Sequence, residues 1–193
     1  MENNSPVEMA LELGLQLLGK KQKIGTMFDP KYSDSTFNSL ASFAKKKAIH
    51  VSAIKVDSAD DAAAYIPAFE GKIDFFVAIR DVTTSQTKSS DALFAFTEKN
   101  NIPIISLDPS HKDRGALLSI SVDPIQLGEQ AWNVAKIILR EKKIPQMPTT
   151  TFASELSLSL SLSQAKKTGL SQVQIMSFLE QSAQKGYQIQ VIP

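Results

Sequence analysis

The sequence contains no cysteine among its 193 residues. This absence excludes disulfide bonds, zinc sites built from thiolates, and cysteine nucleophiles. The chain also lacks an excess of charge of one sign, because 21 basic residues and 20 acidic residues leave a formal net charge of +1. It therefore offers no electrostatic basis for binding nucleic acid or an anionic membrane.

Long apolar runs and common catalytic motifs are missing too. No stretch approaches the roughly 20 apolar residues that span a bilayer, and residues 1–6 have neither a basic nor an apolar segment, so we expect no signal peptide in this chain. The sequence has no P-loop, no G-x-G-x-x-G and no G-x-S-x-G motif. Its two histidines, His50 and His111, lack the spacing of a metal site or a catalytic triad. We expect no enzymatic activity, no cofactor and no bound metal.

What the sequence does contain is a regular series of aspartates, each at the end of an apolar run. The runs are residues 24–28, 51–56, 75–79 and 102–107, and the acids that follow them are Asp29, Asp57, Asp81 and Asp108. Their separations of 28, 24 and 27 residues match the length of a strand–helix–strand unit. Polar residues at the carboxyl ends of parallel strands are where open α/β sheets bind ligands. The acids are therefore predicted to lie along one rim of one sheet.

Helical patterns fill the intervals between these strands. Ser5-Pro6-Val7-Glu8 combines a capping box with proline at the first helical position, and a helix is expected from there to Gly19. Pro67 is expected to shorten the helix that Ser58 caps. Residues 109–114 read as a polar loop and residues 116–122 as a fifth strand. A long helix over residues 124–142 is expected to turn Leu127, Ala131, Val134 and Ile138 inward, with Trp132 packed beside alanines.

The end of the chain adds a strand, a helix and another strand. Residues 154–163 alternate serine and leucine, which predicts a half-buried strand with one apolar face, formed by Leu156, Leu158, Leu160 and Leu162. A last helix is predicted over residues 172–183 and a final strand over residues 187–192. The predicted fold class is α/β: a three-layer, doubly wound, mostly parallel sheet of flavodoxin-like or Rossmann-like type.

The predicted domain organisation is a single α/β lobe over residues 1–193. Residues 6–143 supply the core βα units, residues 144–163 a crossing segment and a strand, and residues 164–193 the C-terminal helix and strand. Prolines 145 and 148 mark the crossing segment, because they interrupt the long helix.

Three loops on the predicted rim carry candidate ligand-binding residues. After the first strand, Ser33 or Ser35 is a natural N-cap, and a helix N-terminus favours a carboxylate or phosphate; plain capping is the alternative. After the third strand, Asp81 and Thr83 suit an ammonium or a sugar hydroxyl, and the alternatives are a helix cap or an internal pair with Arg80. The candidate residues are Asp29, Ser33, Asp34, Ser35, Asp81, Thr83 and Asp108.

The order of these segments resembles the C-terminal lobe of bacterial ABC-transporter solute-binding proteins of the type I periplasmic kind, in the branch of tryptophan-binding-like lipoproteins. The resemblance covers approximately residues 6–170 and rests on an ordered set of segments: Pro6-Val7-Glu8, residues 24–30, residues 71–74, Asp81-Val82-Thr83, Ile102-Pro103-Ile104, Gly115-Ala116-Leu117, Val122-Asp123, Leu127-Gly128 and residues 158–169. Three positions depart from the family pattern, because Asp29, Val82 and Ser161 stand where asparagine is common.

The resemblance implies a binding module in which two lobes close on a small polar solute such as an amino acid. It implies that residues 33–35 meet a ligand carboxylate and that Asp81 with Thr83 meets the ammonium group. It further implies an ABC permease as partner, an extracytoplasmic location, and an N-terminal lobe that is absent from this chain, or a homo-oligomer in its place. Two alternatives stay open: a sensory or scaffold derivative that binds a protein, and a magnesium-dependent phosphoryl-transfer or receiver-like domain with Asp29 and Asp81 around a cation.

Overall fold

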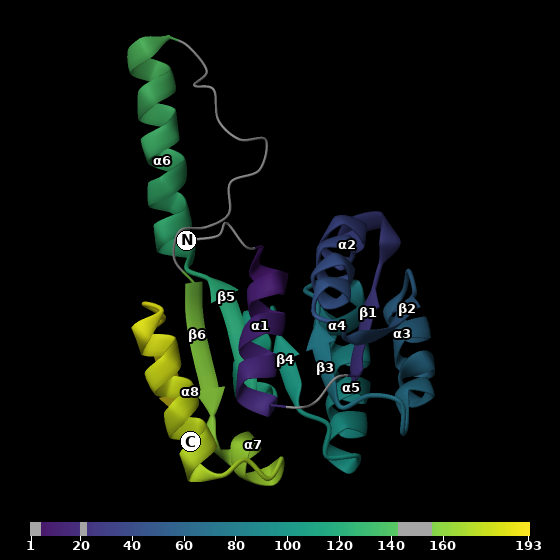
Figure 1. Cartoon of the computed structure of the whole chain (residues 1–193). Helices are drawn as coiled ribbons and strands as arrows, with labels where there is room; N and C mark the ends of the chain where they lie inside the picture. The colour runs from purple at the N-terminus through teal and green to yellow at the C-terminus, as the bar shows by residue number, and fades with distance from the viewer. Residues whose placement is uncertain (1–4, 20–22, 143–155) are drawn as a thin grey trace.

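The computed structural model describes residues 5–19, 23–142 and 156–193. Strands and helices alternate through most of this length (Figure 1). In chain order the elements are α1 (Pro6–Leu18), β1 (Lys23–Phe28), α2 (Pro30–Lys46), β2 (His50–Lys55), α3 (Ala59–Tyr65), η1 (Ile66–Phe69), β3 (Phe75–Ala78), α4 (Val82–Ser85), α5 (Thr87–Lys99), β4 (Ile104–Ser106), η2 (Pro109–Arg114), β5 (Leu118–Val122), α6 (Pro124–Glu141), β6 (Leu156–Ser161), α7 (Leu162–Lys167), α8 (Gln172–Gln184) and β7 (Ile189–Ile192).

The strands form one seven-stranded sheet in the order β2-β1-β3-β4-β5-β6-β7. Strands β1 to β5 run parallel to one another, β6 pairs antiparallel with β5, and β7 is parallel to β6. The order places β1, β3 and β4 side by side in the middle of the parallel part. The prediction of a doubly wound, mostly parallel α/β sheet is confirmed.

Helices cover both faces of the sheet, which gives the three layers. Strand β3 shows the arrangement most directly, because Phe75 and Val77 join the core beneath α1, α2 and α8, whereas Phe76 and Ala78 join the core beneath α3, η1 and α5. All four of these side chains are fully buried. Both faces are apolar because a parallel strand between two helical layers has no solvent side.

Local signals in the sequence place several element ends. Ser5 and Glu8 form the expected capping box at the start of α1, and Pro67 coincides with the expected interruption, since α3 ends at Tyr65 and a 3-10 turn follows. Two expectations are wrong. Residues 109–114 form the 3-10 helix η2 rather than a loop, and Leu162 leaves the leucine face of β6 to begin α7, where it is exposed.

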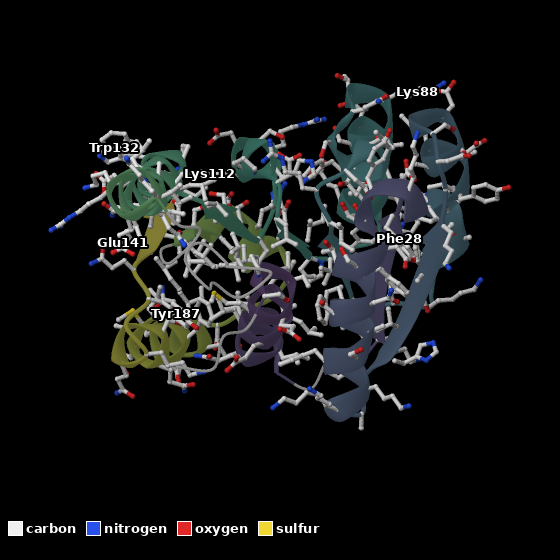
Figure 2. All side chains as sticks on the ribbon, turned by 90° about the horizontal axis from the view of Figure 1, so that it is seen from above. Phe28, Lys88, Lys112, Trp132, Glu141 and Tyr187 are labelled. Carbon is white, nitrogen blue, oxygen red and sulfur yellow. The ribbon has the colours of Figure 1, made fainter. Side chains whose placement is uncertain are left out.

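The largest departure from expectation concerns α6. Its amphipathic pattern predicts a face packed inward, but no residue of α6 is buried, and Trp132 is 57% exposed. Figure 1 shows α6 extending away from the sheet beyond the end of β5, and Figure 2 places Trp132 and Glu141 at the outer margin of the molecule. The prediction that Leu127, Ala131, Val134, Ile138 and Trp132 pack inward is therefore wrong within the described chain.

The proposed crossing segment lies largely outside the described residues, because the structure describes nothing between residue 142 and residue 156. The division into βα core, crossing segment and C-terminal helix and strand stays a prediction. No described helix has both the length and the apolar character needed to cross a bilayer.

Candidate functional site

The site begins with the carboxyl ends of three neighbouring strands. Asp29, Asp81 and Asp108 follow β1, β3 and β4, which are adjacent and parallel. The contacts confirm that the loops meet, because the backbone N–H of Asp29 donates a hydrogen bond to Oδ2 of Asp81 over 2.8 Å. The acidic loops therefore lie on one side of the sheet, as the strand spacing predicts. We call this edge, with residues 29–36, 79–85 and 106–111, the rim.

Asp29 begins α2, which corrects the expected start of that helix. Its Oδ1 accepts a hydrogen bond from the N–H of Lys31 at 2.8 Å, and Pro30 occupies the first helical position. The prediction that Ser33 or Ser35 is the N-cap is therefore wrong, because both lie inside the helix. Asparagine and aspartate are equally good N-caps, so Asp29 fills this role where the related family often has asparagine.

Asp81 is the hydrogen-bonding centre of the rim. Its Oδ1 accepts from the N–H of Thr83 at 2.8 Å and from the Thr83 hydroxyl, while its Oδ2 takes the N–H of Asp29. The carboxylate thus caps the short helix α4 and ties it to the loop after β1. No ion pair to Arg80 is formed among the described residues. Of the two structural alternatives for Asp81, the structure therefore shows the helix cap and not the internal pair with Arg80.

Asp108 caps η2 in the same way. Its Oδ1 accepts from the N–H of Ser110 at 2.9 Å and from the Ser110 hydroxyl at 2.7 Å. Burial raises the pKa of Asp108, but hydrogen bonds from Ser85 and Ser110 and the nearby His111 ring together hold that pKa below its ordinary value. Asp108 is therefore a buried anion at the start of η2.

An open groove lies next to these caps. It has a volume of about 480 Å³ and runs between the start of α1, the first turns of α2 and the ends of β3 and β4. Its lining combines apolar side chains with four hydroxyl residues and one cation: Pro6, Val7, Ile79, Leu107, Ser5, Ser35, Thr36, Ser39 and Arg80. A smaller hollow of about 170 Å³ continues past Pro6, Arg80 and Leu107 to the end of β5. Apolar walls with a few polar groups are typical of small-molecule sites.

Arg80 lies where the two hollows meet and is exposed. Within residues 5–19, 23–142 and 156–193 no carboxylate pairs with its guanidinium. Arg80 is absent from the predicted set of ligand residues, because a basic residue beside an aspartate reads as an internal pair. Its position directly after a buried strand, on the same rim as the acids, is the signal that could have identified it.

The structure separates the predicted ligand residues by exposure. Asp34 and Ser35 are exposed and Asp81 is half-buried. Four members lie beneath the surface, with exposed fractions of 4% or less: Asp29, Ser33, Thr83 and Asp108. The exposed residues and Arg80 are the ones that a solute can reach, whereas the buried ones hold the loops that carry them.

A scan of protein families and two searches for similar proteins bear on this geometry. The family model described as ABC transporter substrate binding protein matches residues 1–185. The chain belongs to this family. The matched range includes every rim residue and ends before β7. The predicted relationship to ABC solute-binding proteins is confirmed.

Three proteins similar to this chain are longer than it is. A tyrosine-binding protein from Clostridioides difficile (strain R20291) is 28% identical over 148 residues, which are 75% of this chain and 42% of that protein. A conserved domain protein from Vibrio cholerae shares 23% identity with a TM-score of 0.73, over 90% of this chain and 59% of the other. An ABC domain from Streptococcus in complex with L-Trp shares 18% identity with a TM-score of 0.71, over 89% and 59%. The chain therefore spans less than two thirds of each.

A second cavity, of about 440 Å³, lies away from the rim. It opens between the end of α5, the end of η2, α7 and β7. Its Lys167 is paired with Glu98 at 2.8 Å, and its Arg114 is paired with Asp91. Among the described residues, no three histidine or acidic side chains gather as they do in a metal site. The rim is thus the place where a cation without a protein partner adjoins a groove.

Proposed function

We propose that this chain supplies one side of a solute-binding cleft and that the solute is a small polar molecule of the amino-acid class, held by its carboxylate. The observation that carries the proposal is Arg80, an exposed guanidinium without an ion-pair partner in the described chain, where the rim groove meets the smaller hollow. A planar guanidinium matches a carboxylate with two parallel hydrogen bonds. Ser35, Thr36 and Ser39 line the same groove, and their hydroxyls would form further hydrogen bonds with the solute.

The apolar part of the groove fits the side chain of such a solute. Pro6, Ile79 and Leu107 line it, and a volume of about 480 Å³ lies within the range of ligand sites. Related proteins support an aromatic amino acid as the solute, since one relative is named a tyrosine-binding protein and one similar structure is a complex with L-Trp. We propose that Asp81 meets the ammonium group from the half-buried side of the rim, while Asp29, Ser33, Thr83 and Asp108 support the loops from below.

We further propose that the intact protein has two lobes and that α6 docks on the second one. No residue of this 18-residue helix is buried within the described chain, and about half of its circumference is apolar. That face combines Val134, Ala135 and Ile138, which are half-buried, with four exposed residues, Leu127, Ala131, Trp132 and Leu139. This chain spans 59% of the length of two similar structures. The remaining part of a longer protein would therefore be large enough to form the second lobe on which α6 docks. Closure of the two lobes would bury the solute outside the cytoplasm, and an ABC permease would receive it.

Replacing Arg80 by alanine is expected to weaken the binding of L-tyrosine by about 10- to 100-fold. This is the affinity that the loss of one charge-assisted hydrogen-bonded pair removes. Binding of tyramine, which lacks the carboxylate, is expected to stay unchanged in the same variant. NMR titration of this chain with both compounds, and with L-tryptophan, measures the affinities. Arg140→Ala is the control, because Arg140 is exposed on α6, away from the groove.

Two results would contradict the proposal. Equal losses for L-tyrosine and tyramine would show that Arg80 contacts no carboxylate. Unchanged spectra of the rim amides with millimolar L-tyrosine and L-tryptophan would exclude an amino-acid site in this groove and would favour a protein-binding derivative, whose partner covers α6.

A further inference from the structure

His111 is a fully buried histidine that the proposed solute site does not use directly. It lies in η2 with 0% of its surface exposed. Nδ1 is 2.9 Å from the Ser106 hydroxyl, and Nε2 is 3.0 Å from the carbonyl oxygen of Thr84. The edge of the ring also packs against Phe94, with the ring centroids 5.0 Å apart. One side chain therefore contacts β4, α4 and α5 at once.

The partners of the ring determine where its proton lies. The carbonyl of Thr84 only accepts, so Nε2 carries a hydrogen and donates it. In the neutral ring Nδ1 is then an acceptor, and the Ser106 hydroxyl donates to it. The Ser106 oxygen in turn accepts the N–H of Asp108 over 2.9 Å. The hydrogen bonds thus run in one direction, from Asp108 through Ser106 and His111 to Thr84.

This chain of hydrogen bonds joins the parts of the rim. Thr84 belongs to α4, and its own hydroxyl donates to the carbonyl of Ile79 at the end of β3. Asp81 caps the same helix and binds the loop after β1. A shift of α4 therefore displaces the loops after both strands. Holding α4 against β4 fixes the spacing between Asp81, Arg80 and the groove.

We propose that His111 is a positioning residue of the rim, whose neutral ring with the proton on Nε2 holds α4 against the end of β4, and that protonation of the ring loosens this tie. A second proton on Nδ1 would have to be donated to Ser106, whose own hydrogen could then turn only to the carbonyl of Asp108, 3.4 Å away. Protonation also leaves a positive charge on a ring with 0% of its surface exposed, and an opening that lets water reach the ring relieves this cost. The loss of solute affinity at low pH that follows rests on the proposed function.

The groups around the ring shift the pKa of His111 in opposite directions. Burial lowers the pKa of His111, the carboxylate of Asp108 and the bond to Thr84 oppose that shift, and Arg114 adds to it. Arg114 itself is paired with Asp91 of α5, while α4 contributes no charged residue of its own. Because the folded pKa lies below 6.5, the unfolded chain binds the proton first. The free energy of unfolding therefore falls as the pH drops below about 7 and stops falling below the folded pKa.

The test uses NMR on this chain without any ligand. Long-range proton–nitrogen spectra are expected to show the proton of His111 on Nε2 at pH 7.5. The amide signals of Thr83, Ser85 and Asp108 are expected to move together on lowering the pH, with a midpoint below 6.5. In His111→Gln, whose amide still donates toward Thr84 but does not titrate, these movements are expected to vanish. They should persist in His50→Gln, since His50 is exposed on β2, at the far edge of the sheet.

Two ligand-free outcomes overturn the proposal. One is a proton on Nδ1, and the other is rim amides that stay still while His111 titrates. His111→Leu, which keeps the bulk but no hydrogen bond, should disturb the rim amides at every pH; if it matches the wild type, the ring serves packing alone.

A second measurement separates this inference from the proposed function. The affinity for L-tyrosine is expected to fall about fivefold between pH 7.5 and pH 5 in the wild type, the weight of one net hydrogen bond, and to stay constant in His111→Gln. If the wild type binds no L-tyrosine at either pH, the proposed function fails, whereas the proton position and the moving rim amides still decide the role of His111. If binding is present and equally constant in both proteins, the role of His111 in solute affinity is overturned.

Discussion

Replacing Asp81 by alanine is expected to lower the free energy of unfolding by about 3 kcal/mol, a large share of the stability of a typical domain. The carboxylate accepts hydrogen bonds from two backbone N–H groups, of Asp29 and Thr83, and from the Thr83 hydroxyl. Thr83 is fully buried, so its hydroxyl and N–H lose their partner without gaining water. Urea unfolding followed by circular dichroism measures the loss.

Two variants make this result specific. Asp81→Asn retains one acceptor oxygen but turns an NH₂ group toward a backbone N–H, so it is expected to lose about half as much stability. Asp34→Ala removes an exposed carboxylate of α2 whose described hydrogen bond is to the side chain of Asn38, and a change within about 0.5 kcal/mol is expected. A similarly small loss for Asp81→Ala would show that the hydrogen bonds at the rim contribute little. The stability effect also means that a binding test is cleaner at Arg80 than at Asp81.

The spacing of the aspartates was sufficient to predict the rim. Each acid ends a strand, parallel strands need a crossover helix, and crossovers in one sheet are right-handed, so the carboxyl ends of the strands share one edge. The observed contact between Asp29 and Asp81 follows from β1 and β3 being neighbours. The parallel arrangement of β1 to β5 was therefore predictable from patterns within single βα units, and the resemblance to the family agreed with it. The strand order and the antiparallel β6 were not predicted from the sequence.

Errors arose where two local signals competed or where burial had no signature in the sequence. Asp29-Pro30 carries the N-cap and first-turn signals of α2, but the serines that follow are equally good caps, so the helix was expected to start later. His111 is surrounded in sequence by lysine, aspartate and arginine. That polarity predicts an exposed loop. The segment instead forms the 3-10 helix η2, which turns the His111 side chain inward against Phe94.

The error at α6 has another cause. Periodicity identifies which face of a helix is apolar, but it does not say whether the partner of that face belongs to the same domain. The apolar stripe of α6 was identified correctly, and the expectation that it faces this sheet was wrong. An apolar helix face that is largely exposed among the described residues is typical of an interaction surface.

Replacing Trp132 and Leu139 by alanine is expected to leave the stability of this chain within about 0.5 kcal/mol of the wild type, because both side chains are exposed, by 57% and 71%. The same changes are expected to weaken association with the second lobe about 30-fold each, since truncating a central aromatic or aliphatic anchor costs about 2 kcal/mol. Trp132 is the one tryptophan of the sequence, so its fluorescence reports on α6 alone. In this chain it should be open to acrylamide quenching, and adding the separately expressed second lobe should shift its emission to shorter wavelength and reduce the quenching.

Sedimentation of this chain alone distinguishes the partner of α6. A monomer with accessible Trp132 at micromolar concentration agrees with docking on a second lobe. A dimer in which Trp132 is protected, and which Leu139→Ala dissociates, would make a second copy of the chain the partner and contradict the two-lobed assembly. Arg140→Ala is the matched control, because Arg140 belongs to the same helix and is exposed, whereas Lys136 is unsuitable because its ammonium lies over the Trp132 ring. Equal effects of Arg140→Ala and Leu139→Ala would show that association does not depend on the apolar face.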